Sequence, residues 1–563
     1  MEKQLIECVP NISEGRDTAK IKAITDVVET VEGAKLLDVD PGKATNRTVI
    51  TIVGEPEPVC EAAFRLIGKA KEMIDMSKHS GEHPRFGATD VCPLVPIANI
   101  SMEECVQHAR KLAERIGNEH GIPVYCYENA AHTEERQNLA NNRSGEYEGL
   151  NAKLSDPHWK PDHGPAEFND SVKKSGATAV SARDFLVAYN VNLNTTSTRR
   201  ANAIAFDIRE AGRLKKENGI SGKNLLDENG EPVRIPGKLK AVKGIGWYIE
   251  EYGIAQLSLN LTNISITSVH EAFEAACEAA SDRGIRVTGS ELVGLIPKKA
   301  MLDAADHFLK KQRRSLGIDE KEKIKIAVKS LGLDDLAPFN PEEKIIEYLL
   351  AGTEKNRLVD MDLVAFANET ASESPAPGGG SIAAYCGALG ASLGTMVANL
   401  SAHKRGWDDR WEEYSQWAEK GQAYKERLLQ LVDEDTSSFE KVMEAFRLPK
   451  SSEAEIAARR KAITEATKGA IMVPFSVMEN CLASMEVMKA MASSGLKASI
   501  SDAGVGALCA RTGVMGAFMN VKINTGDLED KAFVDDILAR GAAIQDQALE
   551  LEKEIIELVE QSI

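Results

Sequence analysis

The hydrophobic pattern turns helical from Met301, and a linker that begins at residue 351 divides the chain into two kinds of structure. Before it, runs with the period-two alternation of strands take turns with stretches in which apolar residues recur every three or four positions, as in helices. After it, strand-type alternation is scarce, and Ala, Leu, Met, Glu and Lys dominate at helical spacing. We therefore expect α/β structure followed by an all-helical bundle of about 200 residues.

The α/β part contains one element order, β-α-β-β-α-β, twice. The first copy is predicted from a strand at 4–9, a helix at 17–31, strands at 35–39 and 47–53, a helix at 56–74 and a strand at 91–98, followed by a helix at 101–119 and a strand near 122–127. The second is predicted from a strand at 185–193, a helix at 197–212, strands at 240–249 and 254–261, a helix at 268–283 and a strand at 285–288. Two such units side by side create a cleft, where ligand sites are common.

These patterns predict the domain limits. We expect an N-terminal α/β subdomain at 1–180, a second at 181–350, a linker at 351–357 and a helical domain at 358–563. The polar segment 128–170 is too long for an ordinary connection, so it is either a functional loop or a partly helical excursion.

Residues 374–402 carry no charged side chain, which approaches the length of a membrane span. The segment is nevertheless rich in Gly, Ala and Ser and is interrupted by Pro375 and Pro377. We therefore expect a tightly packed helix inside a soluble bundle, with Gly390 and Gly394 allowing close helix approach.

The charge balance restricts the partners of the chain. With 86 acids against 68 bases among 563 residues, the formal net charge is −18, which argues against nucleic-acid and anionic-membrane binding, since both need clustered Lys and Arg. The nine cysteines form no C-x-x-C pair, so we expect reduced thiols and no metal site. The N-terminal residues lack the pattern of a secretory signal, and we expect a cytoplasmic protein.

One candidate for acid/base chemistry lies in the segment 80–90, which Gly and Pro break into a loop. His83 precedes a proline and has acids nearby, so it is suited to general acid or base catalysis, although loop histidines are often only solvated. Asp38 and Asp40 share one face of a predicted strand. Asp40 at the strand end is suited either to orienting a histidine or to capping a turn.

The helical part holds a second candidate. Gly378, Gly379 and Gly380 open directly into the uncharged helix, and backbone N–H groups at such a start can bind an anion or a carbonyl oxygen, although the pattern alone is weak. Further on, the apolar stripe of residues 432–446 includes Asp435, while Asp433 aligns with charged residues. A core-facing Asp435 is either an acid/base group or part of a structural ion pair.

These segments occur together in one family. The chain resembles the bifunctional formimidoyltransferase-cyclodeaminases over nearly its whole length. The transferase-like segments are CVPNISEG (8–15), DVDPG (38–42), TNRTV (45–49), SGEHPRFGATDVCP (80–93), PDHGP (161–165), KLKAVKGIGWYIEEYGIAQLSLNLTN (238–263) and GSELVGLIP (289–297). The cyclodeaminase-like segments are APGGGS (376–381), LVDEDTSSFEKVMEAFRLPK (431–450) and SDAGVGALCARTGVMGAFMNVKIN (501–524).

The resemblance implies two reactions. The first half would move a formimino group from N-formimino-L-glutamate to tetrahydrofolate, ending histidine breakdown. The second would close 5-formiminotetrahydrofolate to 5,10-methenyltetrahydrofolate and release ammonia. By motif position, His83 would move the proton in the transfer with Asp40 orienting it, and Asp435 would be the cyclodeaminase acid/base.

The resemblance also implies a folate-binding stretch at 161–170, where Asp162, Gly164 and Pro165 match best and His163 stands where we expect an aromatic residue. It implies a homo-oligomer built as a ring of dimers, with polyglutamylated folate held between sites. The cations for that tail would be sought at Lys404, Arg405, Arg447 and Lys450. Two alternatives remain: formyl transfer between 5-formyltetrahydrofolate and glutamate, and a folate-binding scaffold without chemistry.

Overall fold

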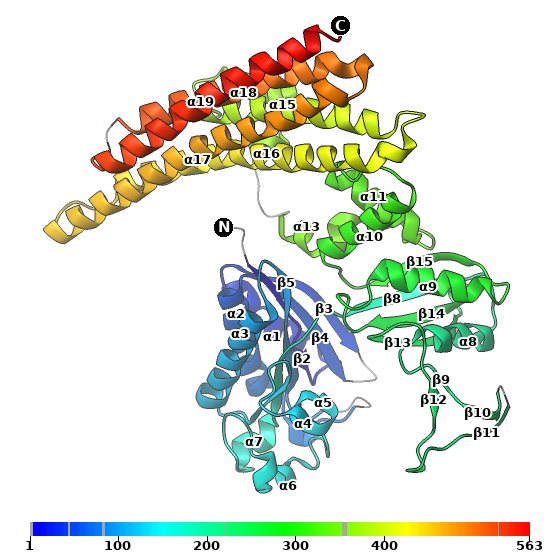
Figure 1. The fold of residues 1–563 in the computed structure, drawn as a ribbon. Coiled ribbons are helices and arrows are strands. Elements are labelled where there is room, and N and C mark those ends of the chain that lie inside the picture. The colour runs from blue at the N-terminus through cyan, green and yellow to red at the C-terminus, as the bar shows by residue number, and fades with distance from the viewer. Residues whose placement is uncertain (1–3, 43–45, 82–84, 220, 352–356, 527) are drawn as a thin grey trace. The chain divides into compact units, whose positions relative to one another are not determined.

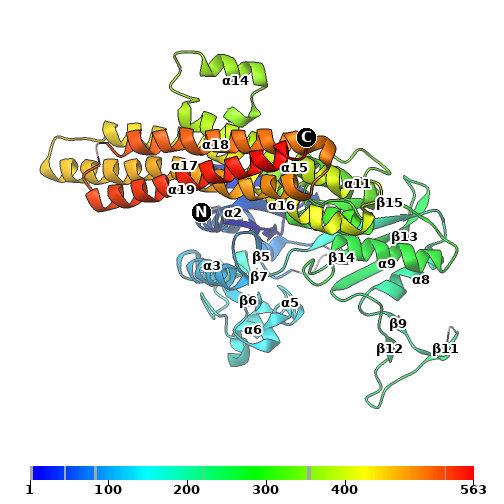
Figure 2. The same cartoon turned by 45° about the horizontal axis from the view of Figure 1, so that its top comes forward.

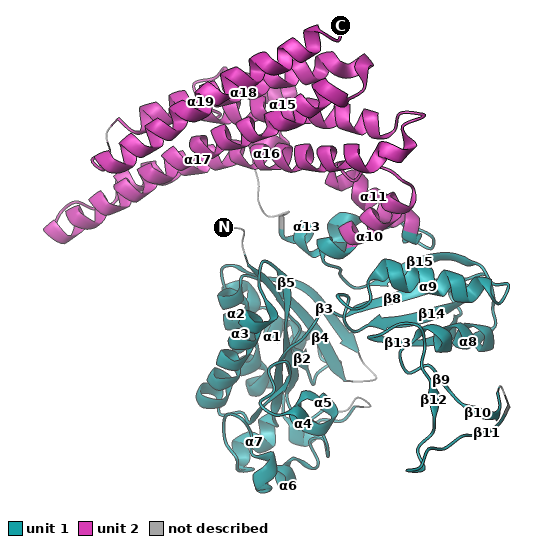
Figure 3. Ribbon diagram, viewed as in Figure 1, with its two compact units in different colours: residues 1–300, 331–352 teal, residues 301–330, 353–563 magenta. Residues whose placement is uncertain are grey.

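The computed structural model describes residues 4–42, 46–81, 85–219, 221–351, 357–526 and 528–563. It divides into two compact units, one of residues 1–300 and 331–352 and one of residues 301–330 and 353–563 (Figure 3). The first is mixed α/β and the second is helical, as the change in periodicity predicts.

The N-terminal sheet of the α/β unit has seven strands. They are β1 (Leu5–Cys8), β2 (Asn11–Ile12), β3 (Ala34–Gly42), β4 (Arg47–Gly54), β5 (Thr89–Ala98), β6 (Val124–Glu128) and β7 (Thr178–Ala182). β1 and β2 both lie between β4 and β5, β3 pairs with the outer side of β4, and β7 and β6 follow β5. The β5–β7 and β7–β6 pairs are parallel and the others are antiparallel.

The two faces of this sheet bury different residues, as period-two geometry requires. On one face, α2 (Pro56–Met73) and α3 (Met102–Arg115) pack on strand residues such as Ile6 and Cys126, while α1 (Thr18–Thr25) packs on α2 (Figure 1). On the other face, Tyr125 and Tyr127 pack with apolar residues of the segment after β6. That segment is partly helical, with α4 (Glu134–Gln137), α5 (Leu139–Asn142), α6 (Leu150–Ser155) and α7 (Asp170–Ser175).

Two features of this sheet differ from the expectation. The expected helix at 17–31 ends at Thr25, and a short 3-10 turn follows at Val28–Thr30. β7 was not expected at all, because its TAVSA sequence is short and consists mostly of small residues. β7 lies between β5 and β6 and spans residue 180, where we expected the first subdomain to end.

The second sheet has four antiparallel strands in the order β13-β14-β8-β15. Its elements are β8 (Val187–Leu193), α8 (Thr198–Ile208), β13 (Val242–Ile249), β14 (Ile254–Leu261), α9 (Val269–Ser281) and β15 (Val287–Val293), which is the expected order. Ser268 and Glu271 cap α9 reciprocally, which fixes where this helix begins. Short strand pairs between α8 and β13 were not expected: β9 (Arg213–Leu214) with β12 (Arg234–Ile235), and β10 (Lys216–Asn218) with β11 (Ser221–Asn224).

Helices alone follow β15. They are α10 (Lys298–Lys311), α11 (Glu320–Leu331), α12 (Pro341–Lys344), α13 (Ile346–Ala351), α14 (Leu363–Thr370), α15 (Gly379–Ala402), α16 (Trp411–Arg447), α17 (Glu453–Ser494), α18 (Ile500–Asn524) and α19 (Lys531–Glu560). The five long helices α15 to α19 pack side by side in the helical unit. In Figure 2, α14 projects from the bundle; none of its residues is buried, but Phe366 contacts Tyr385 of α15 with ring centroids 5.4 Å apart.

The uncharged segment forms α15, which packs against α16, α17 and α18. A Cβ on Gly390 would come within 2.7 Å of the Gly506 carbonyl oxygen of α18, so close helix approach at this position needs glycine. By length and composition alone, α15 and α17 could each cross a membrane, but 61% and 56% of their most apolar stretches are buried within the unit. Such burial is typical of core helices.

The expectation that the whole stripe 432–446 faces the core is wrong. Val432 is fully buried, but Phe439 and Phe446 are 48% and 50% exposed. The C-terminal part of α16 and the N-terminal part of α17 project beyond the other long helices (Figure 1), and residues of α17 are buried only from Ala470 onward. No third helix covers the stripe there among the residues that the structure describes.

Candidate active sites

In the helical unit, Asp435 of α16 lies at the N-terminus of α15. Ser381 Oγ donates a hydrogen bond to Asp435 Oδ2 at 3.1 Å, and its backbone N–H also donates to this carboxylate. The same Ser381 hydroxyl lies 3.0 Å from the Val432 carbonyl oxygen. Because α15 begins at Gly379, the carboxylate meets the positive end of the helix dipole. The structure therefore brings together the predicted glycine turn and the predicted carboxylate.

Gly380 allows this approach. A Cβ at Gly380 would lie 2.2 Å from Asp435 Oδ1 and 2.6 Å from Oδ2, closer than any real carbon approaches an oxygen without a bond. At Gly379, a Cβ would come no closer than 3.4 Å to Asn520. The anion at the glycine turn is thus the Asp435 side chain of this chain itself.

Burial raises the pKa of Asp435 above its ordinary value, while the hydrogen bonds from Ser381 lower it. A carboxyl with a raised pKa can hold and release a proton closer to neutral pH, as acid/base catalysis requires. Asp433, which aligns with charged residues along the helix, has a backbone partner: its Oδ1 accepts from the Leu358 N–H at 2.7 Å, and burial raises its pKa as well. Asp433 thus fastens the segment before α14.

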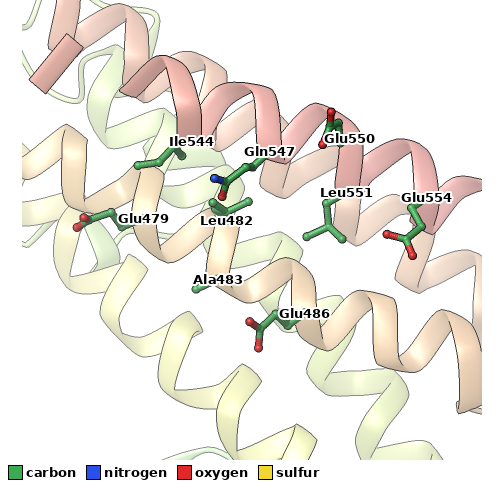
Figure 4. Close-up of a pocket in the computed structure, with 9 residues that line it drawn as sticks. All are labelled: Glu479, Leu482, Ala483, Glu486, Ile544, Gln547, Glu550, Leu551 and Glu554. Carbon is green, nitrogen blue, oxygen red and sulfur yellow. The ribbon is translucent and has the colours of Figure 1, made fainter. Parts of the chain in front are cut away.

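The cations expected for a polyglutamate tail do not form one cluster within the chain. Lys404 and Arg405 precede α16, while Arg447 ends it and Lys450 follows. The 37 residues of α16 span about 55 Å at 1.5 Å per residue. A groove between α17 and α19 (Figure 4) is equally unsuited to an anionic tail, because Glu479, Glu486, Glu550 and Glu554 line it.

In the α/β unit, His83 lies outside the described residues, so its position relative to Asp40 is not described. β3 is an edge strand of the sheet. Asp38 and Asp40 are both exposed on one face of it, as their spacing predicts. Asp40 pairs across the ladder with Val49 of β4.

Three of the predicted transferase segments meet at Asp90, which is fully buried. Its Oδ2 pairs with the guanidinium of Arg47 and, at 2.7 Å, with that of Arg143, while Oδ1 accepts from the Phe86 N–H at 3.1 Å. Arg47 also donates to Asn11 Oδ1 at 2.9 Å. Residues 11, 47 and 90 come from the segments 8–15, 45–49 and 80–93 and lie on β2, β4 and β5, so this network ties the three segments together.

A second network holds the loop on either side of the undescribed residues 82–84. Asn46 Nδ2 donates to the Ser80 carbonyl oxygen at 2.9 Å, and Asn46 Oδ1 accepts from the Gly15 N–H at 3.0 Å. The His79 ring lies 3.0 Å from the Asn46 carbonyl oxygen, and Arg85 Nε lies 3.2 Å from His79 Nδ1. Burial lowers the pKa of His79.

We did not single out Arg47, Asp90 or Arg143 from the sequence. The available signal was a charged residue, Asp90, directly before the apolar run VCPLVP of β5. A charge at the start of a fully buried strand needs buried partners. The partners themselves lie 43 and 53 residues away, and no local pattern points to them.

The expected folate stretch forms a tight loop beside β6. Asp162 Oδ2 accepts from the Cys126 N–H at 2.7 Å, and its Oδ1 pairs with Arg136 at 2.5 Å. Gly164 has φ +83°, and a Cβ there would lie 2.2 Å from the Ile122 carbonyl oxygen. Asp162 and Gly164 therefore shape the loop that carries Pro165.

The same loop takes part in a cluster that the sequence did not suggest. One potential ligand atom each of Cys126, His132 and His163 lie within 4.8 Å of one another. Five residues separate Cys126 from His132 and thirty separate His132 from His163, a spacing that matches no familiar metal motif. Only the tertiary structure brings them together.

An α/β unit whose polar segments converge, joined to a helical unit with a half-buried carboxylate at a helix N-terminus, defines an enzyme of two catalytic parts. The family models that match are the "Formiminotransferase domain, N-terminal subdomain" at 5–183, the "Formiminotransferase domain" at 188–351 and "Formiminotransferase-cyclodeaminase" at 362–543. The chain belongs to the formimidoyltransferase-cyclodeaminase family.

Curated relatives match the whole chain or a part of it. The formimidoyltransferase-cyclodeaminase of Gallus gallus is 44% identical over 94% of each chain. The glutamate formimidoyltransferase of Streptococcus pyogenes is 41% identical over 54% of this chain and 93% of its own length. The methenyltetrahydrofolate cyclohydrolase of Methylorubrum extorquens is 35% identical over 35% of this chain and 95% of its own length.

Proposed function

We propose that the α/β unit transfers the formimino group of N-formimino-L-glutamate to tetrahydrofolate, giving 5-formiminotetrahydrofolate and glutamate. The helical unit then cyclises this product to 5,10-methenyltetrahydrofolate and releases ammonia. The match to the two-activity relatives over 94% of the chain carries the proposal. Tetrahydrofolate is therefore a co-substrate of the first step.

In the second step, N10 of the folate attacks the formimino carbon, and the C–N bond to the departing nitrogen then breaks. The departing nitrogen needs two protons to leave as ammonia: one is the proton that N10 loses, and the other comes from solvent or is already carried by a protonated formimino group. We assign the transfer of the N10 proton to Asp435, because its carboxylate is half-buried at a helix N-terminus and desolvation there raises its pKa. Gly378, Gly379 and Gly380 supply the backbone around it.

In the first step, N5 of tetrahydrofolate attacks the formimino carbon and the bond from that carbon to the glutamate nitrogen breaks. A proton passes from N5 to the glutamate nitrogen. We assign it to His83, by its place in the segment 80–93, with Asp40 as the orienting carboxylate. Asp162, Gly164 and Pro165 are the proposed folate-binding residues. Side chains move the transferred proton in both steps, so neither step requires a metal.

Several finer properties belong to the same proposal. Both α/β subdomains are proposed to be ferredoxin-like, which the order β13-β14-β8-β15 with two helices supports for the second. The domain limits 181–350, 351–357 and 358–563 belong to the proposal, but the limit at residue 180 shifts to the end of β7 at Ala182, so that the first subdomain is 1–182 and the second begins at 183. A ring of dimers, a polyglutamylated folate, a cytoplasmic location and a role in histidine degradation complete the proposal.

The test uses the purified full chain with formiminoglutamate and tetrahydrofolate. We expect methenyltetrahydrofolate absorbance and one ammonia for each turnover. His83→Ala should abolish transfer but leave cyclisation of supplied 5-formiminotetrahydrofolate, and Asp435→Ala should do the reverse. Absence of both products would overturn the proposal, and turnover with 5-formyltetrahydrofolate and glutamate alone would favour formyl transfer.

A further inference from the structure

We propose that Cys126, His132 and His163 bind a zinc ion in the α/β unit. A thiolate and two imidazoles are the ligand types that zinc prefers in proteins. The cluster lies outside the helical unit that holds Asp435, and it does not depend on the proposed function. Its three ligands come from positions that the backbone holds in place.

Cys126 is on β6, labelled in Figure 2, and pairs in the ladder with Val180 of the neighbouring strand β7. Its side chain is fully buried on the face of the sheet that α3 covers. Its backbone N–H is bound by Asp162, the residue directly before His163. The thiol therefore has a fixed position next to the loop that carries one of the histidines.

His163 is held by backbone contacts on both sides. The Val124 N–H of β6 donates to the His163 carbonyl oxygen at 2.9 Å, so residues 162–163 extend the sheet edge beside Cys126. A Cβ on Gly117 would lie 2.6 Å from the His163 Cβ, so the loop also packs closely on the segment after α3. The imidazole of His163 thus starts from a rigid backbone.

His132 follows a turn that ends β6. The Ala130 and Ala131 N–H groups donate to the carbonyl oxygens of Tyr127 and Glu128. Arg110 of α3 donates to the carbonyl oxygens of Ala130 and Ala131 at 3.1 Å each. The turn is therefore fixed, while the His132 side chain is exposed and able to rotate toward the other two ligands.

The geometry needs only a small adjustment. With zinc–nitrogen bonds of about 2.0 Å and zinc–sulfur bonds of about 2.3 Å, tetrahedral ligand atoms lie roughly 3.3–3.8 Å apart. The three ligand atoms here lie within 4.8 Å of one another. Rotation of the exposed His132 ring closes part of that difference, and the fourth position stays open for water.

Metal binding must release a proton from the thiol. The pKa of Cys126 is raised to about 12, chiefly by burial and also by Asp162, with Arg110 and Arg136 acting in the opposite direction. The metal-free thiol is thus protonated at neutral pH, and zinc binds the thiolate. The affinity should therefore rise with pH, because zinc competes with a proton for the sulfur.

The experiment is a titration of the metal-free full chain with Co²⁺ as a spectroscopic probe, followed by Zn²⁺. We expect one equivalent of Co²⁺ to produce intense visible bands of a tetrahedral ion and a sulfur-to-cobalt band in the near ultraviolet, all removed by Zn²⁺. X-ray absorption of the zinc form should show one sulfur at about 2.3 Å and nitrogen ligands at about 2.0–2.1 Å.

His132→Ala is the decisive variant, because His132 is exposed and its loss should not affect folding. We expect at least tenfold weaker binding, and Cys126→Ser should lose the sulfur band. His158→Ala is the matched control: His158 is exposed on the same segment, and its Nε2 lies 2.7 Å from Glu135 Oε2, outside the cluster. Zinc affinity equal to wild type in His132→Ala, or a zinc form without a sulfur ligand, would overturn the proposal.

Discussion

The carboxylate of Asp435 occupies the space that a side chain on Gly380 would need, with Oδ1 only 2.2 Å from the position of a Cβ. At this point α15 and α16 are in such close contact that a larger residue at position 380 would displace the Asp435 side chain. The glycine gives the carboxylate access to the N-terminus of α15, and the carboxylate accepts the Ser381 hydrogen bonds at that end.

Gly380→Ala should therefore abolish cyclisation. The added methyl group must displace the Asp435 carboxylate, and we expect at least a tenfold loss of methenyltetrahydrofolate formation from supplied 5-formiminotetrahydrofolate. Transfer from formiminoglutamate should be unchanged. Gly469→Ala in α17 is the control, because no atom lies within 4 Å of a Cβ there, and it should keep both activities. Full cyclisation by Gly380→Ala would show that the contact does not matter.

Asp435→Asn tests the charge rather than the shape. General acid/base groups contribute about 10²–10⁴-fold, so we expect a loss of that size in cyclisation. Because burial raises the pKa of Asp435, ionisation opposes folding, and the variant should be the more stable protein at neutral pH. That advantage should vanish at low pH, where the carboxyl of the wild type is protonated. Asp433→Asn, measured in parallel, should keep its activity, and an equal loss there would contradict the assignment.

Glu7 on β1 should make the α/β unit less stable as the pH rises. It is 7% exposed, and burial raises its pKa to about 7, with Arg183 acting in the opposite direction. A raised pKa favours the folded state below the unfolded pKa, and this contribution is lost as the pH rises through about 7. We expect a loss of up to about 3 kcal/mol between pH 5 and pH 8.

Glu7→Gln should remove this dependence. Chemical unfolding followed at several pH values measures it, and hydrogen exchange of β1 assigns it to the α/β unit. Glu72→Gln is the control, since the Glu72 side chain is 67% exposed on α2. If wild type and Glu7→Gln responded equally to pH, the carboxyl of Glu7 would not be the source.

Asp90→Asn should destabilise the α/β unit strongly. The variant leaves the guanidinium groups of Arg47 and Arg143 buried without a counter-charge, which costs about 3–5 kcal/mol for a broken buried pair. Asp26→Asn removes an exposed partner of Lys22 and should change stability by less than about 1 kcal/mol. Denaturant unfolding measures the free energy of unfolding of both variants. Equal losses in the two would mean that the ion pairs of Asp90 do not stabilise the fold more than an exposed pair does.

Much of the fold follows from the sequence because long elements carry strong periodicity. α2 and β4 lie within a residue or two of their predicted limits. β7 escaped because five small residues carry no alternation, and the strand forms only because β5 and β6 flank it. The short strands β9 to β12 lie in a polar segment, so their sequences also lack the alternation of apolar and polar residues that predicts a strand.

Asp435 is predicted from an apolar stripe of α16 that the structure supports only in part. Its stripe is buried at Val432 but exposed at Phe439 and Phe446. Asp435 is partly shielded from solvent because the glycine turn of α15 lies against it, and the sequence of a single helix cannot reveal that contact. The same limit applies to Cys126, His132 and His163, which only the fold of the loop after β6 brings together.

The cap of α15 has one further consequence. The helix carries no charged residue of its own. The negative charge at its N-terminus comes from Asp435 of α16, 54 positions beyond Ser381. Any proton that Asp435 takes up removes this charge and weakens the hold on the first turn. The stability of the first turn of α15 therefore depends on the protonation state of one carboxyl group. The turn is most stable when Asp435 is ionised and less stable when it is protonated.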